Sequence, residues 1–184
     1  MTNNIIDKKY APGWAWEDFD SYFSPERSAF PMYGNVVTLQ NEKTLNVEPA
    51  VFENELKITD KSYGREAFSN QFYFGKNKVG KTEIPMIIDS VLLIKLWNDL
   101  LPNRVKIVKK SKIKLSKTAY SIPSDSLFKR MMEVSDNFLA EQLLILASST
   151  LSDTLNSSKA RDFILENQLK DLNQKPRWVD GSGL

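Results

Sequence analysis

Short stretches of alternating hydrophobic and polar residues occupy the first half of the chain. The apolar or alternating runs lie at 36–39, 51–58 and 68–74, and turn-forming stretches at 41–43 and 75–77 separate them. Runs of this length, bounded by turn residues, are typical of β-strands that place one face on a core. This pattern predicts a β-rich region between residues 12 and 82. Further short strands are predicted at 105–108 and 113–115.

A helical period then replaces the alternation. Asp89 is placed to cap a helix that ends at Leu100. The residues expected to face a core from that helix are Val91, Leu92, Ile94, Lys95 and Leu96. Farther along, apolar residues recur at i, i+4 and i+7, which predicts a second helix over 124–133. Its apolar stripe consists of Leu127, Met131 and Val134, widened by Phe128 and Met132.

A third helix begins near Asn137 and is apolar over most of its circumference, so it is predicted to be buried between other elements. Its apolar residues are Leu139, Leu143, Leu144, Leu146 and Ala147. A fourth, amphipathic helix is predicted from about Asn156 to Leu172, and residues 177–179 are predicted to form a short strand.

The composition restricts the possible catalytic and metal-binding chemistry more than it restricts the possible folds. The chain has 184 residues, 41% of them hydrophobic and 26% charged, which is enough to bury a core. It contains neither histidine nor cysteine. This excludes Ser-His-Asp and Cys-His nucleophilic sites and argues against zinc, iron-sulfur and disulfide chemistry. We therefore expect no metal and no cofactor, and any serine nucleophile would need a lysine base.

The 25 basic and 23 acidic residues leave a formal net charge of +2, which is too small to indicate a nucleic-acid partner. A local lysine cluster alternates with apolar residues, as the exposed face of a strand pair would. It consists of Lys106, Lys109, Lys110, Lys112, Lys114 and Lys117. Residues 1–14 lack the apolar stretch of a secretory signal, and no apolar run approaches the roughly 18 residues of a membrane span. Neither an export signal nor a membrane span is expected within this chain.

Ser135, Asp136 and Asn137 lie between two of the predicted helices. A Ser-x-Asn corner lets two short polar side chains point into one cleft, while the residue between them points away or caps the next helix. Two interpretations remain open at this point. Ser135 and Asp136 could serve only as helix caps, or Ser135 and Asn137 could belong to the S-x-x-K, S-D-N and K-T-G trio of penicillin-reactive serine enzymes.

Three stretches occur in the order found in one enzyme family. They are Gly13-Trp14-Ala15-Trp16-Glu17-Asp18 followed by Tyr22, the segment from Tyr120 to Leu143, and VDGSGL from Val179 to Leu184. On these stretches the chain resembles the D-alanyl-D-alanine carboxypeptidases of the penicillin-binding-protein 4 type, the serine peptidase S13 family. The similarity spans nearly the whole chain, and the long central segment is its most specific part.

The resemblance implies a serine-type hydrolase of the periplasm or cell envelope that cleaves the terminal D-Ala-D-Ala bond of peptidoglycan stem peptides, often with endopeptidase activity. Its acyl-serine intermediate is the one that β-lactams such as penicillin trap. It also implies an α+β fold, with a β-rich accessory insertion at 1–118 and a helical piece of the penicillin-binding-protein/β-lactamase-like catalytic domain at 119–184. By the same resemblance, Ser135 would relay a proton to the leaving amine and Asn137 would bind the substrate. Asp180 and Ser182 would lie near the substrate, although flanking glycines also suit them to shaping a turn.

The sequence departs from the complete family pattern, because the S-x-x-K and K-T-G elements do not occur at the matching places. Two strings look like S-x-x-K, beginning at Ser126 and Ser111, and two look like K-T-G without its glycine, beginning at Lys81 and Lys117. All four fail on position, and the last two also lack the glycine that lets a substrate lie close to the strand. We therefore expect a fragment of such an enzyme that is inactive by itself.

A rival interpretation is a non-catalytic envelope module that binds peptidoglycan or a protein partner. It would use the aromatic residues near Trp14 and Trp16 together with the lysine-rich strands. Aromatic faces suit saccharide rings, but such a cluster is also what packs a long loop. Binding to purified peptidoglycan would separate the two interpretations.

Overall fold

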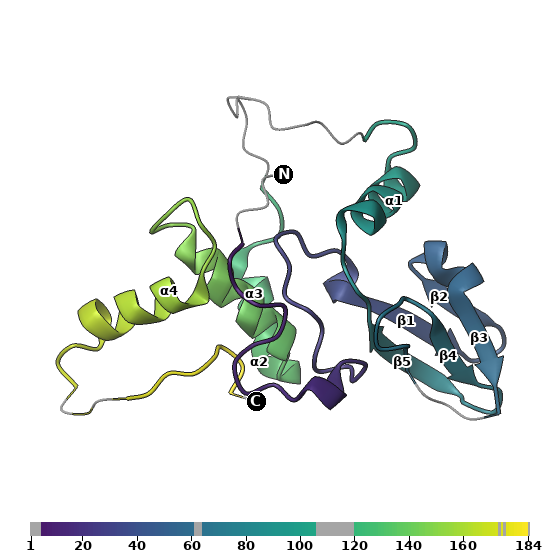
Figure 1. The fold of residues 1–184 in the computed structure, drawn as a ribbon, viewed down its shortest axis with the longest axis horizontal. Coiled ribbons are helices and arrows are strands. Elements are labelled where there is room, and N and C mark those ends of the chain that lie inside the picture. The colour runs from purple at the N-terminus through teal and green to yellow at the C-terminus, as the bar shows by residue number, and fades with distance from the viewer. Residues whose placement is uncertain (1–4, 61–63, 106–119, 173, 175, 184) are drawn as a thin grey trace.

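The computed structural model describes residues 5–60, 64–105, 120–172, 174 and 176–183. Apart from Val105, the strands predicted at 105–108 and 113–115 lie outside these residues, as do the lysine cluster, Ser111 and Lys117. The described chain is a mixed α+β structure. Figure 1 shows the strands gathered on one side of the molecule and helices α3 and α4 on the other.

The strands form two small sheets. An antiparallel sheet has the order β2-β1-β5, made from β1 (Val36–Asn41), β2 (Leu45–Glu48) and β5 (Gly80–Pro85). A parallel pair is made from β3 (Leu56–Thr59) and β4 (Phe72–Gly75). β1 and β2 are joined across the predicted turn at 41–43, and Leu39 lies opposite Val47 in β2 and Thr82 in β5.

The main core lies between these sheets and helix α1. Alternate residues of β1 enter it, so Val37 and Leu39 are fully buried while Gln40 is exposed. Phe72 and Phe74 do the same from β4, and Phe52 meets Phe72 edge to face with ring centroids 5.3 Å apart. The alternation of buried and less buried residues in β1 and β4 is what a strand with one face on a core produces.

Two of the predicted strands are shorter than expected. Residues Ala50–Glu55 form a 3-10 helix, and only Leu56–Thr59 of the run at 51–58 is a strand. In the run at 68–74 the strand begins at Phe72, and the Phe68 side chain is 86% exposed. Phe52 enters the core from the 3-10 helix, so that apolar position is buried without strand pairing.

Helix α1 (Ser90–Leu100) begins as predicted, because the Asp89 carboxylate accepts a hydrogen bond of 2.7 Å from Leu92 N. Leu92 and Leu96, one turn apart, are buried in the core. The prediction was wrong for Val91, whose side chain is 73% exposed, and for Lys95, which is also exposed. Leu92, the neighbour of Val91, occupies the core-facing position, and a single residue step turns a helix by about 100°.

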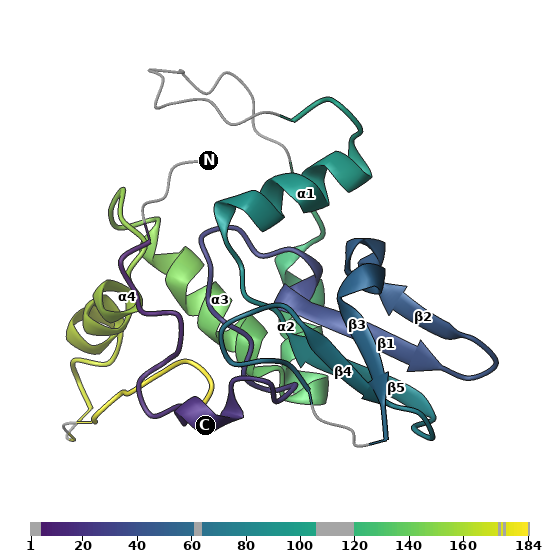
Figure 2. The same ribbon diagram turned by 45° about the vertical axis from the view of Figure 1, so that its right-hand side comes forward.

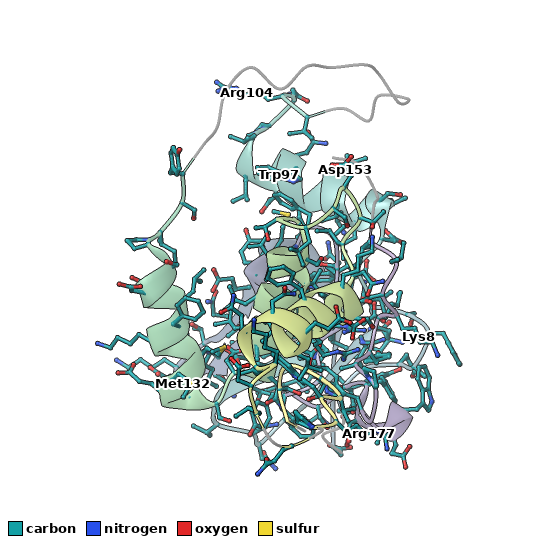
Figure 3. The ribbon with its side chains drawn as sticks, turned by 90° about the vertical axis from the view of Figure 1, so that its left-hand side faces the viewer. Lys8, Trp97, Arg104, Met132, Asp153 and Arg177 are labelled. Carbon is teal, nitrogen blue, oxygen red and sulfur yellow. The ribbon has the colours of Figure 1, made fainter. Side chains whose placement is uncertain are left out.

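Helix α2 (Ser124–Val134) confirms the predicted second helix, but none of its residues is buried. Phe128 is 48% and Met132 75% exposed. Figure 3 shows α2 at the margin of the molecule, with Met132 labelled on it. The described chain therefore leaves much of the apolar stripe of α2 uncovered.

Helix α3 (Asn137–Ser148) is followed by α4 (Ser157–Phe163), which a π-helical turn continues through Ile164–Gln168. Residues 137–145 of α3 are buried or partly buried, but the prediction of a buried helix was wrong for Leu146, which is 58% exposed, and for Ala147, which is also exposed. The predicted cap of α4 is present, since Asn156 Oδ1 accepts from Ser158 N at 2.8 Å. The helix ends at Gln168 and not at Leu172.

No strand forms at 177–179. Side chains bind the backbone carbonyls here, because Arg161 donates to Val179 O and the Trp178 indole donates to Asp180 O. These two carbonyls therefore accept hydrogen bonds from side chains and not from the N–H groups of a neighbouring strand. Among the described helices, none combines the length and the apolar character that crossing a membrane requires.

Candidate functional site

The corner between α2 and α3 is made by Ser135. Its backbone is left-handed, with φ 53° and ψ 53°. Its N–H and that of Asp136 both donate to Met131 O, which closes the end of α2. The left-handed conformation costs a non-glycine residue roughly 1–2 kcal/mol. The chain therefore keeps serine at a position that glycine would fill with less strain.

Capping of α3 is done by Asp136 and not by Ser135. Asp136 Oδ1 accepts a hydrogen bond of 3.0 Å from Leu139 N, and Oδ2 lies 3.9 Å from Arg130 Nε. Ser135 is exposed, and its hydroxyl makes no hydrogen bond to a described residue. The side-chain cap of α3 is thus made by Asp136, whereas Ser135 closes the end of α2 through its backbone N–H and leaves its hydroxyl without a described partner.

Ser135, Asp136 and Asn137 all line one cavity. Its volume is about 370 Å³, and we refer to it as the Ser135 cavity. Asn137 Nδ2 donates to Phe23 O at 3.3 Å, which fixes the loop at 22–25 against the start of α3. The other wall comes from the segment around Tyr33 and from Glu83 of β5.

A second cavity of about 610 Å³ adjoins the Ser135 cavity, and we refer to it as the β5 groove. The two share Tyr22, Glu83 and Arg130 in their walls. Residues of α2, of the corner at its end and of β5 line the two cavities. Figure 2 shows how these elements are arranged. The string Lys81-Thr82-Glu83 lines the β5 groove, so the structure brings this K-T-E strand near the S-D-N corner.

One turn beyond Asn137, the same helix carries a buried carboxylate. Glu141 is fully enclosed, and its Oε2 accepts a hydrogen bond of 3.0 Å from Arg27 Nη1. Its Oε1 accepts from Gly181 N at 2.6 Å and from Ser182 N at 3.1 Å. Glu141 therefore links three segments that are remote in sequence: the first 30 residues, α3 and the DGSG turn.

Arg27, the partner of Glu141, is itself 5% exposed and fully engaged. Its Nε and Nη2 donate to Lys8 O at 3.1 and 2.8 Å, and Nη2 also reaches Tyr10 O at 3.1 Å. Asp7 Oδ2 lies 3.6 Å from Arg27 Nη1 and accepts from Ser157 N at the start of α4. Buried charges require such pairing to offset the loss of hydration.

Asp180 and Ser182 lie in this network and line neither cavity. Asp180 Oδ1 accepts from Gly183 N at 2.7 Å, which makes the turn that the flanking glycines suggested. Ser182 Oγ accepts from the Trp14 indole at 3.2 Å. Their proposed proximity to substrate stays a prediction. The structure shows instead that the G-W-x-W-x-D and DGSG segments touch each other.

Arg27 and Glu141 are not among the functional residues predicted from the sequence. A signal was present for one of them, because Glu141 is the only charged residue of α3. A lone charge inside a strongly apolar helix indicates a buried partner. Nothing local identified Arg27 as that partner, 114 positions earlier. The predicted division at residues 118 and 119 stays a prediction, although these contacts tie the first 30 residues to the helical part.

The aromatic cluster near Trp14 divides into a buried and an exposed part. Trp14 is 8% exposed, whereas Trp16 is 52% exposed and stacks on Phe19 and Phe68 with centroids 5.7 and 5.9 Å apart. Tyr10 meets Trp16 edge to face. Burial of the Tyr10 hydroxyl, with the nearby Glu26 carboxylate as a further cause, raises the pKa of Tyr10 to about 12.

The S-x-x-K string at Ser126 shows no sign of an activated hydroxyl. Ser126 is exposed in the first turn of α2 and lines neither cavity. Lys129 lies 3.7 Å from Glu133 at the next turn, which makes a surface ion pair. In the described part of the chain, no three histidine, cysteine, aspartate or glutamate residues group as metal ligands would.

Comparisons with known proteins add no identification. No protein-family model matches the sequence, and no curated protein matches it either.

Proposed function

We propose that Ser135 and Asn137 form the second catalytic motif of a serine-type D-alanyl-D-alanine carboxypeptidase acting on peptidoglycan stem peptides. The observation that carries the proposal is the difference between the contacts of Asp136 and those of Ser135 at the corner. Asp136 caps α3, while the Ser135 hydroxyl stays exposed on a strained backbone beside Asn137. A residue held in a sparsely populated conformation, whose hydroxyl makes no hydrogen bond to a described residue, is a candidate for a functional role.

The convergence of the three resembling segments supports the same proposal. Trp14 of the first contacts Ser182 of the third, and Glu141 at the end of the second binds the third through two backbone amides. The segments that resemble one family in sequence therefore also contact one another. Each contact joins residues at least 40 positions apart.

In the proposed reaction, the nucleophilic serine and its lysine base come from elements that residues 1–184 do not carry at the matching positions. Ser135 would pass a proton toward the leaving amine as the acyl-serine forms. Asn137 would hold the acyl side of the substrate through its amide. Catalysis of this kind rests on positioning and hydrogen bonding, because it uses no cofactor.

Labelling with a fluorescent penicillin tests the proposal. The 184-residue chain is expected to stay unlabelled, and a polypeptide that joins it in frame to S-x-x-K and K-T-G elements from the flanking coding sequence is expected to be labelled. In that longer protein, Ser135→Ala should lower turnover of a D-Ala-D-Ala peptide by about 10²-fold, whereas Ser126→Ala should leave it unchanged. Stoichiometric labelling of the short chain at Ser126, or stop codons on both sides of the segment, would contradict the proposal.

One observation favours the rival function, a module that binds peptidoglycan. The exposed stack of Trp16 and Phe68 offers aromatic surface of the kind on which sugar rings pack. Trp14 offers none, since it is buried against Ser182. Trp16→Ala with Phe68→Ala should then abolish co-sedimentation with purified peptidoglycan while the fold is retained. If the double variant sediments with peptidoglycan as the parent chain does, the module interpretation fails.

A further inference from the structure

The outer edge of β5 exposes backbone hydrogen-bonding groups. Met86 N donates to Asn35 O at 2.9 Å across the β1 and β5 ladder. Hydrogen-bonded pairs alternate along an antiparallel ladder, so the even-numbered residues of β5 exchange bonds with β1. Lys81 and Glu83 consequently turn their N–H and C=O groups away from β1. In the described part of the chain, no strand pairs with them.

This edge borders open space. Lys81, Thr82 and Glu83 form one wall of the β5 groove, and Tyr22 and Arg130 contribute to the others. The groove continues into the Ser135 cavity through shared lining residues. A strand laid along β5 would therefore lie in an existing hollow and would not have to displace packed side chains.

The charges of the groove favour an acidic occupant. Lys81 is neutralised by its ion pair with Glu83. The Asp20 carboxylate packs on Gly64 and faces the buried guanidinium of Arg65.

Two cations remain without a close carboxylate among the described residues. Lys78 precedes β5 and lies 5.9 Å from the Phe74 ring, and Arg130, near Glu83, has only the distant contact of 3.9 Å to Asp136. The two cations flank the exposed edge.

We infer that the outer edge of β5 binds an extended peptide with acidic side chains, which adds to the sheet as a fourth strand. Main-chain bonds to Lys81 and Glu83 supply affinity, and Lys78 and Arg130 select for carboxylates at the two ends of the bound stretch. Three extended residues span about 10 Å. The inference stands on the sheet edge and its charges and does not rest on the proposed peptidase function.

The backbone part is tested with a fluorescein-labelled pentapeptide, acetyl-Asp-Val-Thr-Val-Asp-amide, whose binding is followed by fluorescence anisotropy. Glu83→Pro removes the outward N–H and leaves the ladder to β1 intact, because proline is tolerated where the N–H faces away from the sheet. Glu83→Ala is its matched control, since it removes the same carboxylate and keeps the N–H. Glu83→Pro is expected to weaken binding at least about tenfold relative to Glu83→Ala.

The charge part uses a double reversal, Lys78→Glu with Arg130→Glu. This variant should lose affinity for the acidic peptide and gain affinity for the matching peptide that has lysine in place of aspartate. Lys76→Glu with Lys129→Glu reverses two neighbouring cations that do not line the groove, and it should leave the preference unchanged. Circular dichroism on all variants confirms that the sheet is retained.

Three outcomes would overturn the inference. The first is equal binding by the proline and alanine variants, and the second is an acidic preference that survives the double reversal. The third is a concentration-dependent dimer in analytical ultracentrifugation that Glu83→Pro abolishes, because the occupant of the edge would then be a second copy of β5. Since none of these measurements involves penicillin or acylation, they leave the test of the peptidase function separate.

Discussion

The guanidinium of Arg27 and the carboxylate of Glu141 lie 3.0 Å apart in the interior, although the two residues are separated by 114 positions in the chain. Their side chains are 3% and 0% exposed. The pair joins the first segment of the chain to α3. Glu141 also accepts hydrogen bonds from the amides of Gly181 and Ser182, which joins the DGSG turn to the same helix. This contact holds together the segments on which the functional proposal depends.

Removing one partner of that pair should be costly. Glu141→Ala leaves the buried Arg27 guanidinium with Asp7, 3.6 Å away, as its only nearby carboxylate among the described residues, and it leaves the amides of the DGSG turn without an acceptor. We expect the free energy of unfolding to fall by about 3–5 kcal/mol. Urea denaturation measures the change. Glu133→Ala, which removes an exposed carboxylate from a surface pair, should cost less than about 1 kcal/mol and serves as the control. Similar losses for both variants would contradict the assignment.

Gly181 is predicted to be intolerant of a side chain. A Cβ at this position would lie 2.9 Å from Ala140 O of α3, inside van der Waals contact. Gly181→Ala should therefore push the DGSG turn off α3, lower stability by about 1–3 kcal/mol and change the fluorescence of Trp14. At Gly183 a Cβ would meet nothing within 4 Å, so the backbone φ of 75° is the only feature that disfavours a side chain there. Gly183→Asn should thus be mild, since asparagine tolerates that region.

The corner residues should respond in opposite directions. Asp136→Ala removes the cap of α3 and should cost about 1 kcal/mol. Ser135→Gly relieves the left-handed strain at φ 53° and should raise the melting temperature, with a gain of up to about 1 kcal/mol. A loss of stability in Ser135→Gly would mean that the hydroxyl has a structural bond, and the argument for its functional role would fail.

Stability should decline at high pH because of Tyr10. Its pKa is raised from 10.0 to about 12 in the folded chain, chiefly by burial and next by Glu26. Above pH 10 the unfolded chain loses this proton while the folded chain keeps it, so the Tyr10 contribution is full below pH 10 and is lost as pH rises toward 12. Tyr10→Phe should show a shallower decline between pH 10 and 12 in thermal unfolding. Parallel curves for the two proteins over that interval would contradict the prediction.

The starts of α1 and α4 were predictable because their signals are local. Asp89 and Asn156 occupy positions where a short polar side chain meets the first free amides of a helix, and both cap as expected. The turn between β1 and β2 was found for the same reason. These features depend on a few neighbouring residues, which a single sequence displays.

The missed features depend on distant residues. The run at 51–58 is apolar enough for a strand, but Phe52 reaches the core from a 3-10 helix instead. Residues 177–179 have strand character, but Arg161 occupies the carbonyl of Val179 that a neighbouring strand would need. In the site, Ser135 and Asn137 line one cavity together with Asp136, and the catalytic role of the first two stays a prediction. The pairing of Arg27 with Glu141 has no local signature and could be found only from the structure.

The buried carboxylate of Glu141 should also determine how fast the amide hydrogens of Gly181 and Ser182 exchange with solvent. Gly181 and Ser182 lie in a segment without regular secondary structure, where amide hydrogens normally exchange with solvent deuterium within seconds to minutes. Their acceptor is fully enclosed, so exchange has to wait until α3 separates from the DGSG turn. These two amides should therefore exchange as slowly as the middle of α3, while the amide of exposed Arg177 exchanges at once. They report directly how often the convergent segments come apart.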